Sequence, residues 1–218
     1  ASCLVGSEMC IRDSLYLDSD YEKYRIGIAV NDDQHIYAIQ LESIGTKNIS
    51  LEPLDQIDLR YMLPNLNSDE FKLVSRAKQL LHWYTNNTYC SSCGTKNVFE
   101  ETEQTFYCKC KNIFTYPTIS PCIITLVTRD NKILLARNKL FPLGMFSALA
   151  GFIEAGETAE EALVREVSEE VNLNVHNITY YSSQAWPFPS QLMIGYYCEC
   201  PDGDPEPDGE GIEEAAWF

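Results

Sequence analysis

Eight residues between Gly151 and Leu173 fit the spacing G-x5-E-x7-R-E-U-x-E-E-x-G-U, in which U is an aliphatic residue. They are Gly151, Glu157, Arg165, Glu166, Val167, Glu169, Glu170 and Leu173. Only the last glycine of the pattern is replaced, by Asn172, and asparagine is the next best residue for a left-handed helix cap. A glutamate-rich helix is most often just a solvated acidic face. Eight matches at fixed spacing indicate instead a loop–helix–loop site.

The acids of this segment divide by position. At about 100° per residue, Glu166, Glu169 and Glu170 share one side of a helix. Three neighbouring carboxylates repel one another unless a cation lies among them. Hard oxygen ligands that leave room for water and phosphate oxygens are typical of Mg²⁺ or Mn²⁺ sites. We expect Glu157 and Arg165 to pair with each other and to hold the loop against the helix.

The sequence also predicts where this helix begins and which face is buried. Thr158 and Glu161 have the spacing of a capping box, so the helix should begin there, with Glu157 just outside it. Leu163 and Val167 lie on the face next to the acids, and they should anchor the helix to a sheet.

A second set of candidate ligands is the cysteines of two close pairs: Cys90, Cys93, Cys108 and Cys110. Four soft thiolates in two pairs suit a tetrahedral zinc ion, and a site filled by four protein ligands is structural. The second pair is spaced C-x-C, whereas a zinc ribbon normally has C-x2-C. The alternative interpretation is a set of reduced structural thiols, which would leave this small hairpin without an adequate core.

Apolar runs predict the strands that must position the acids. Residues 122–128 (CIITLVT) and 133–137 (ILLAR) read as buried strands joined by the turn RDNK, and 145–152 (MFSALAGF) leads into the glutamate motif. Cys198 and Cys200 stand at i and i+2 of a later strand, and we predict that both are buried apolar residues.

The N-terminal part has a different pattern. Residues 24–30 (YRIGIAV) and 35–44 (HIYAIQLESI) predict strands. A helix should begin at Asn67 or Ser68, because acids follow in its first turn and apolar residues recur at helical spacing after them. Residues 15–85 are therefore interpreted as a small α+β domain.

These motifs together resemble the Nudix hydrolases and, within them, the NADH pyrophosphatases. The resemblance runs from about Leu66 to Phe218. Residues 183–193 (SQAWPFPSQLM) resemble the signature SQPWPFPxS, which separates NADH pyrophosphatases from other Nudix enzymes. The cysteine pairs, the Tyr116–Pro117 dipeptide, AGFIEAGET and the terminal EAAWF also lie where the family has them.

The resemblance implies an α+β chain with a small N-terminal domain, a zinc ribbon and a Nudix mixed-sheet fold that carries the loop–helix–loop. We assign residues 15–85 to the first, 86–116 to the second and 117–218 to the third. Residues 1–14 contain CLVGSEMCIRDS, which resembles the translated read-through of a sequencing adapter, and we interpret them as an artefactual leader. The family continues beyond the point that corresponds to Phe218, so the resemblance implies that the C-terminal part is missing.

The implied activity is hydrolysis of the pyrophosphate of NADH or NAD to nicotinamide mononucleotide and AMP. By resemblance, Glu166 and Glu170 hold the metal ions together with the carbonyl oxygen of Ala150, and Glu169 helps to bind metal or to activate water. Gly151, Glu157 and Arg165 complete the structural motif. The implied substrate-binding residues are Tyr116, Phe152, Gln184, Trp186, Phe188, Ser190 and Gln191. In the family the signature tryptophan reaches the neighbouring subunit's site, so a homodimer is implied.

Besides Asn172, three positions depart from the family pattern. Ala185 replaces a proline of the signature, and Gln191 replaces its serine. The family's late metal-binding glutamate would fall at Gly211. The late ligand therefore stays open among the neighbouring acids Glu210, Glu213 and Glu214.

Composition restricts the remaining choices. The net charge of −16 argues against broad binding to a phosphate backbone, so any contact with RNA should be local. No apolar run is long enough to cross a bilayer, so we expect no membrane partner. Nine cysteines without a secretory signal indicate a reducing compartment, and we expect a cytoplasmic location, with peroxisomal or other organellar targeting left open.

Three alternatives to NADH hydrolysis remain open at this point. Removal of NAD caps from RNA is a related activity that the sequence cannot separate from it. A different Nudix enzyme would act on ADP-ribose or dinucleoside polyphosphates, and the WPFP signature weighs against it. A non-catalytic binding module, in which the ribbon docks a partner, would have no reason to keep three mutually repelling glutamates.

Overall fold

The structure is a computed structural model, and it describes residues 4–6, 9–12, 25–31, 34–39 and 59–218. The chain divides into two compact units. The first, called here the N-terminal unit, comprises residues 1–119 and 187–190, and the second, the C-terminal unit, comprises 120–186 and 191–218. Within the described residues, no helix is long and apolar enough to span a membrane.

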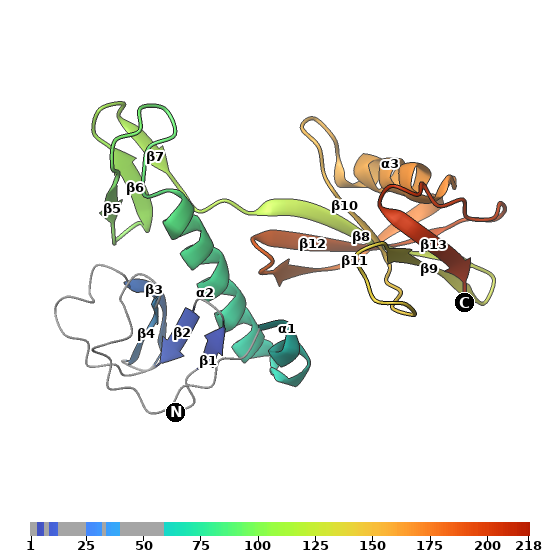
Figure 1. The fold of residues 1–218 in the computed structure, drawn as a ribbon, viewed down its shortest axis with the longest axis horizontal. Helices are drawn as coiled ribbons and strands as arrows, with labels where there is room; N and C mark the ends of the chain where they lie inside the picture. The colour runs from blue at the N-terminus through green and yellow to red at the C-terminus, as the bar shows by residue number, and fades with distance from the viewer. Residues whose placement is uncertain (1–3, 7–8, 13–24, 32–33, 40–58) are drawn as a thin grey trace. The chain divides into compact units, whose positions relative to one another are not determined.

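The described part of the N-terminal unit begins with an antiparallel sheet in the order β1-β2-β4-β3 (Figure 1). Its strands are β1 (Leu4–Gly6), β2 (Met9–Arg12), β3 (Arg25–Asn31) and β4 (Gln34–Ile39). The predicted strands at 24–30 and 35–44 are confirmed as β3 and β4 over their described residues. Residues 13–24 and 40–58, which complete the predicted strand-rich region, lie outside the described residues.

Residues 1–14 were interpreted as an artefactual leader, but the structure pairs part of this segment with the sheet. Strand β2 pairs with β4 along the register Cys10↔Ile39, Ile11↔Ala38 and Arg12↔Tyr37. A free edge of β4 presents unpaired backbone N–H and C=O groups, and any extended segment with few breakers can satisfy them. The described residues of this segment therefore take part in the sheet, whatever their origin.

Two short helical turns precede the long helix of this unit: α1 (Leu59–Met62), the 3-10 helix η4 (Leu63–Asn65) and then α2 (Ser68–Asn86). Asn67 caps α2, because its side chain accepts hydrogen bonds from the N–H groups of Asp69 and Glu70, both at 3.0 Å. The Glu70 carboxylate accepts the Asn67 N–H at 2.9 Å, which completes a capping box. The predicted helix start is confirmed.

One face of α2 forms a core with the elements that follow it. A small antiparallel sheet in the order β5-β6-β7 comprises β5 (Val98–Glu100), β6 (Thr105–Cys108) and β7 (Ile113–Thr115). Its inner face carries Phe99 and Phe106, whose rings lie 5.0 Å from the Tyr84 ring, and Phe106 also lies 5.1 Å from Trp83. The buried residues of this core are Ala38, Leu59, Val74, Ala77, Leu80, Leu81, Trp83 and Phe106.

The C-terminal unit is a mixed sheet in the order β11-β12-β8-β9-β13, with β10 also paired to β8 (Figure 1). Its strands are β8 (Ser120–Arg129), β9 (Lys132–Asn138), β10 (Leu149–Phe152), β11 (His176–Trp186), β12 (Gln191–Glu199) and β13 (Ile212–Trp217). Strands β12 and β8 run parallel, and the other pairs are antiparallel. The predicted mixed sheet is confirmed.

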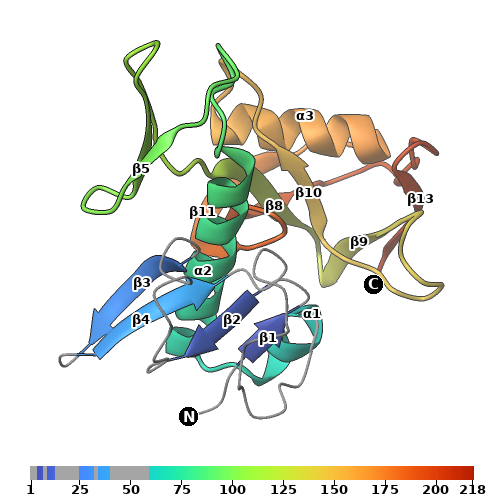
Figure 2. The ribbon, with the colours of Figure 1, turned by 60° about the vertical axis from the view of Figure 1, so that its left-hand side comes forward.

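Helix α3 (Ala159–Val171) packs on this sheet against β10 and β8 (Figure 2). The core between them is aliphatic: Ile123, Val127, Leu134, Leu149, Leu163, Val167 and Val171 are all at most 2% exposed. Full burial of such side chains stabilises the fold by roughly 1.5 to 3 kcal/mol each. This core fixes the position of α3, and therefore of its acids, relative to β10.

Candidate metal and substrate site

Helix α3 is built as the sequence predicts. The Thr158 hydroxyl accepts the Glu161 N–H at 3.2 Å, and the Glu161 carboxylate accepts the Thr158 N–H at 2.8 Å, so the capping box is confirmed. The helix ends at Asn172, whose φ of 54° and ψ of 40° are left-handed. Asparagine thus replaces the glycine of the motif without a change of backbone.

Arg165 joins the loop before α3 to the acids on the helix. Its Nε and Nη2 atoms donate to the two Glu157 oxygens at 2.6 and 3.0 Å, which confirms the predicted pair. Nη2 also donates to the carbonyl oxygen of Phe152 at 2.9 Å. Nη1 donates to Glu166 at 2.9 Å and to Glu169 at 3.0 Å, two contacts that the sequence did not predict. One guanidinium therefore orders both the loop and two of the candidate ligands.

The Glu157 carboxylate is held ionised by these partners. The hydrogen bond from Arg165, and next that from the Glu154 N–H, lower the pKa of Glu157 to about 2. A depressed pKa contributes stability above the unfolded value, and that contribution is lost as the pH falls towards 2. The ion pair between Glu157 and Arg165 is therefore fully formed at neutral pH.

The motif requires glycine at position 151 for a steric reason. Gly151 lies in β10, and a Cβ atom at this position would stand 1.9 Å from the carboxyl carbon of Glu166. Only a residue without a side chain lets the Glu166 carboxylate rest against the strand. Ala150, whose carbonyl is the expected third ligand, directly precedes Gly151 in the same strand. The strand thus brings the backbone of the expected ligand next to the helix acid.

Glu170 has one buried carboxylate oxygen atom that no described residue satisfies. Its Oε2 atom is buried and accepts no hydrogen bond from any described residue. Burial, and next the charges of Glu166, Asp208 and Glu169, raise the pKa of Glu170 to about 7. Hard oxygen atoms that repel one another and leave a buried lone pair unused fit a divalent cation such as Mg²⁺ or Mn²⁺.

Metal-free protein should lose stability as the pH rises from about 4.5 to about 7. In this window the folded chain keeps the Glu170 proton that the unfolded chain has released, so unfolding releases a proton and higher pH favours it. The change should amount to about 2 kcal/mol once partial exposure is allowed for. Urea unfolding in EDTA at several pH values measures it.

Glu170→Gln is the matched variant for this titration, because it keeps the shape of the side chain and cannot ionise. Its stability should vary less with pH than that of the wild type across the same window. Excess Mg²⁺ should also stabilise the wild type more at the upper end of the window than at the lower end. Equal pH slopes for the two proteins would contradict the assignment.

Asp208 is an acid near Glu170 that the sequence analysis missed. Its N–H donates to the Glu170 carbonyl oxygen at 3.0 Å, and its charge contributes to the raised pKa of Glu170. Its carboxylate accepts the N–H groups of Ile212 at 2.8 Å and of Glu210 and Gly211 at 3.1 Å, and these bonds lower its own pKa. An aspartate followed by glycines is the sequence signal of such a turn.

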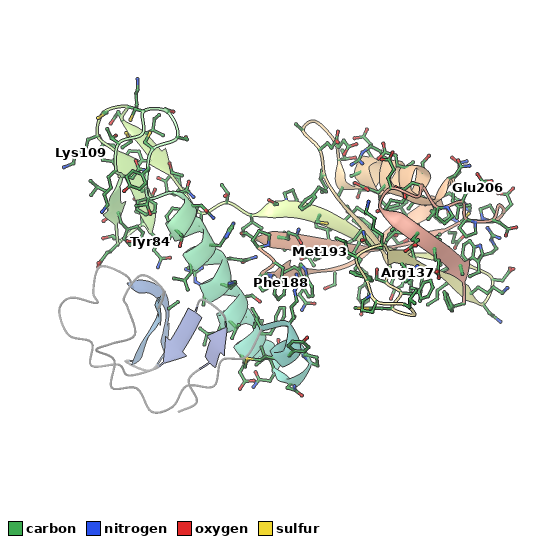
Figure 3. The ribbon with its side chains drawn as sticks, in the orientation of Figure 1. Tyr84, Lys109, Arg137, Phe188, Met193 and Glu206 are labelled. Atoms are coloured by element: carbon green, nitrogen blue, oxygen red, sulfur yellow. The ribbon has the colours of Figure 1, made fainter. Side chains whose placement is uncertain are left out.

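The acids expected around the late ligand have other partners. Glu213 and Glu214 bind the buried Arg137 of β9 at 2.9 and 2.8 Å, whereas Glu210 is exposed. Figure 3 shows Arg137 in the region of the sheet where β9 lies. Of the acids in this loop, Asp208 is the one whose charge reaches Glu170.

Four of the expected substrate-binding residues lie in the C-terminal unit. Phe152 ends β10 with an exposed ring, directly beyond Gly151. Trp186 and Gln191 face each other across the end of the β11–β12 hairpin, and Gln184 pairs with Met193 farther along it. The hairpin register therefore brings Trp186 and Gln191 together.

The other three belong to the N-terminal unit. Tyr116 is exposed, and its hydroxyl donates to Glu103 at 3.4 Å. The Arg60 guanidinium lies 4.8 Å above the Phe188 ring. Ser190 is buried, and its hydroxyl donates to the carbonyl oxygen of Thr118 at 2.9 Å. Phe188 and Ser190 thus have structural contacts within their own unit.

Three of the four expected zinc ligands come together. The Sγ atoms of Cys90, Cys93 and Cys108 lie within 4.8 Å of one another. Cys110 is outside this group: it follows β6 in a turn, and the Thr95 hydroxyl donates to its sulfur at 3.7 Å. The Thr95 side chain, and next its backbone, lower the pKa of Cys93 to about 6. A thiolate favoured in this way is the form that binds metal.

Cys122, Cys198 and Cys200 are buried, as predicted for Cys198 and Cys200. Cys122 is buried beside the acids: burial, and next the charges of Glu166 and Glu170, raise its pKa to about 11. It therefore stays a neutral thiol beneath the carboxylates.

Residues 118–218 match the NUDIX domain family. The chain is also similar to the crystal structure of a Nudix hydrolase from Nitrosomonas europaea. The TM-score is 0.52 at 26% sequence identity, over 60% of this chain and 77% of that one. The mixed sheet and α3, with its motif of acids, therefore form a Nudix fold.

Two curated relatives define the family more closely. The NAD-capped RNA hydrolase NudC of Pseudomonas syringae pv. syringae (strain B728a) is 38% identical over 88% of this chain and 68% of that protein. The NAD-capped RNA hydrolase NudC of Pseudomonas aeruginosa (strain LESB58) is 38% identical over 84% and 64%, respectively. The chain belongs to the family of these proteins, the NADH pyrophosphatases that its motifs predicted. It spans about two thirds of the length of these two relatives.

Proposed function

We propose that this protein hydrolyses the pyrophosphate bond of NADH or NAD to nicotinamide mononucleotide and AMP, and removes NAD caps from RNA by the same reaction. The proposal is carried by the buried Glu170 carboxylate oxygen, which lies among other acids and has no hydrogen-bond partner in the described part of the chain. This oxygen fits a metal-dependent site on the helix of a Nudix fold. The names of the curated relatives and the WPFP signature support the substrate class.

We assign the metal site to Glu166, Glu170 and the carbonyl oxygen of Ala150, with Glu169 binding metal or orienting water. A bound Mg²⁺ or Mn²⁺ would polarise phosphoryl oxygens and lower the pKa of a coordinated water. Arg165 positions Glu166 by its hydrogen bond, and Gly151 gives that carboxylate room. Asp208 adds negative charge near Glu170, and this charge would further favour binding of a cation.

The exposed rings of Phe152, Trp186 and Tyr116 supply surfaces on which nicotinamide or adenine can stack. Gln184 and Gln191 offer amide groups beside Trp186 for the polar edges of a base or a ribose. By family resemblance we also propose a homodimer in which the tryptophan serves the partner's site. In this assignment residues 15–85, 86–116 and 117–218 are the N-terminal domain, the zinc ribbon and the Nudix domain.

A product assay tests the function. Purified protein is incubated with NADH, an NAD-capped oligoribonucleotide, ADP-ribose or diadenosine tetraphosphate, each with and without Mn²⁺. We expect reduced nicotinamide mononucleotide and AMP from NADH, and nicotinamide mononucleotide and 5′-monophosphate RNA from the capped RNA. All of these products should depend on metal and should form much more slowly with Glu170→Gln. Faster turnover of ADP-ribose or the dinucleoside polyphosphate would assign another Nudix activity, and no hydrolysis of any substrate would favour a binding module.

Purified protein should contain about one zinc ion per chain, and Cys93→Ser should lose it, because each thiolate contributes directly to a structural zinc site. Elemental analysis of both proteins measures this. Ser92→Ala, the neighbouring position without a thiol, is the control and should keep its zinc. Cys110→Ser decides whether the fourth thiol, outside the cluster here, is also a ligand. Equal zinc in wild type and Cys93→Ser would remove the assignment.

A further inference from the structure

The small sheet β5-β6-β7 has an exposed apolar face opposite its core. Val98, Tyr107 and Phe114 are direct cross-strand neighbours, so they form one row across all three strands. Val98 is 46% and Phe114 is 52% exposed, and the Tyr107 and Phe114 rings lie 4.7 Å apart. This row, called here the aromatic row, places two adjacent aromatic rings and one aliphatic side chain on the face of the sheet opposite its core.

The charges around the aromatic row are separated by sign. Lys96 precedes β5, and Lys109 and Lys111 lie in the turn between β6 and β7, which is at the same end of the sheet. Figure 3 shows Lys109 at the outer edge of this sheet, away from α2. The acids of the sheet, Glu100, Glu101 and Glu103, belong to the opposite turn.

Three lysines at one end of a small sheet are unusual in a chain of net charge −16. All three lysines are exposed, and none forms an ion pair with another described residue. The exposed Tyr89 is bridged to Lys96 through the backbone and adds another ring at this end. A local group of lysines beside adjacent aromatic rings suits a ligand with alternating phosphates and planar bases.

We propose that the aromatic row and the three lysines bind single-stranded RNA, namely the nucleotides that follow the NAD cap. Bases would stack on Phe114 and Tyr107, while the lysines would neutralise phosphates. A protein partner fits less well, because a single row of apolar side chains offers little area to bury. The inference rests on the proposed function, since only a capped RNA, and not NADH, has a chain to occupy this face.

Binding of an uncapped, 3′-labelled oligoribonucleotide of about 12 nucleotides, followed by fluorescence anisotropy, tests the surface directly. Phe114→Ala should weaken binding about fivefold or more, because a stacking surface is lost, whereas Phe114→Trp should keep the affinity. Lys109→Gln combined with Lys111→Gln should reduce the slope of log K against log salt by about 1.4. The matched controls are Tyr61→Ala, at a ring that is 78% exposed on α1, and Lys72→Gln on α2.

Kinetics separate this inference from the proposed function. With Phe114→Ala, kcat/KM for NAD-capped RNA should fall about as much as the RNA affinity, and kcat/KM for NADH should stay unchanged. Wild-type protein that hydrolyses NADH but binds no RNA would overturn the inference and leave the function intact. RNA binding through this face without hydrolysis of NADH or capped RNA would overturn the proposed function and leave the RNA-binding surface intact.

Two further results would also overturn the inference. One is RNA affinity in the Phe114→Ala and lysine variants that equals the affinity of the Tyr61→Ala and Lys72→Gln controls. The other is a change of oligomeric state in Phe114→Ala, seen by sedimentation, with RNA affinity unaltered. This second result would assign the face to a protein contact.

Discussion

Glu166→Gln and Glu170→Gln should each lower kcat for NADH by about 100-fold or more, which corresponds to about 2.7 kcal/mol of transition-state stabilisation. Each change keeps the side-chain shape and removes the charge of a proposed metal ligand. The Glu170 variant should lose more metal affinity, because its carboxylate oxygen has no other described partner, whereas Glu166 also binds Arg165. Steady-state rates over a range of Mn²⁺ concentrations measure both effects, and rising Mn²⁺ should partly restore activity.

Two acids of the same helix provide the controls. Glu161 serves the capping box, and Glu160 accepts a hydrogen bond from the Tyr196 hydroxyl at 3.2 Å. Glu160→Gln and Glu161→Gln should therefore leave kcat nearly unchanged, and a small loss of stability is expected at the cap. If all four substitutions reduced activity by the same small factor, the acids would be a solvated face and the metal assignment would fail.

Gly151→Ala should reduce kcat by roughly 10- to 100-fold while the protein still folds. The new Cβ would fall 1.9 Å from the carboxyl carbon of Glu166, so this carboxylate has to leave its position. The displaced group is the far end of a side chain, so the backbone of α3 can stay in place. Circular dichroism and thermal unfolding should therefore resemble those of the wild type, and the rate with NADH should fall.

A double-mutant cycle tests this cause. If Gly151→Ala acts through Glu166, its effect should nearly vanish in a Glu166→Gln background, because the carboxylate is already lost. Multiplicative losses in the double variant would show that the alanine acts elsewhere, for example on the pairing of β10 with β8.

The sequence predicts those parts of the site that depend on local rules. The start of α3 follows from Thr158 and Glu161, its end from Asn172, and its buried face from the spacing of aliphatic residues. The pairing of Glu157 with Arg165 was expected because opposite charges lie in the loop and on the helix that follows it. Each of these features needs only contacts within one motif, so spacing is enough to predict them.

The parts that were missed depend on tertiary structure. Asp208 comes near Glu170 only because the chain returns to the end of α3 before β13, and no local pattern reveals such a return. The parallel pairing of β12 with β8 is equally non-local. At the cysteines, spacing predicted four equivalent thiols, whereas the turn after β6 sets Cys110 apart from the other three. Charge alone did not reveal that Arg165 also binds Glu166 and Glu169.

Arg165 acts as an internal counter-ion for the glutamates of α3. Its guanidinium holds Glu166 and Glu169 in place without any bound cation, so the carboxylates are already ordered when a metal ion arrives. In the proposed site, metal binding would therefore cost little conformational entropy from these side chains. Because the guanidinium shares the Glu166 and Glu169 carboxylates with the incoming cation, it would also lower the net metal affinity and favour reversible loading. Such a site would respond to the free concentration of divalent cations rather than hold one permanently.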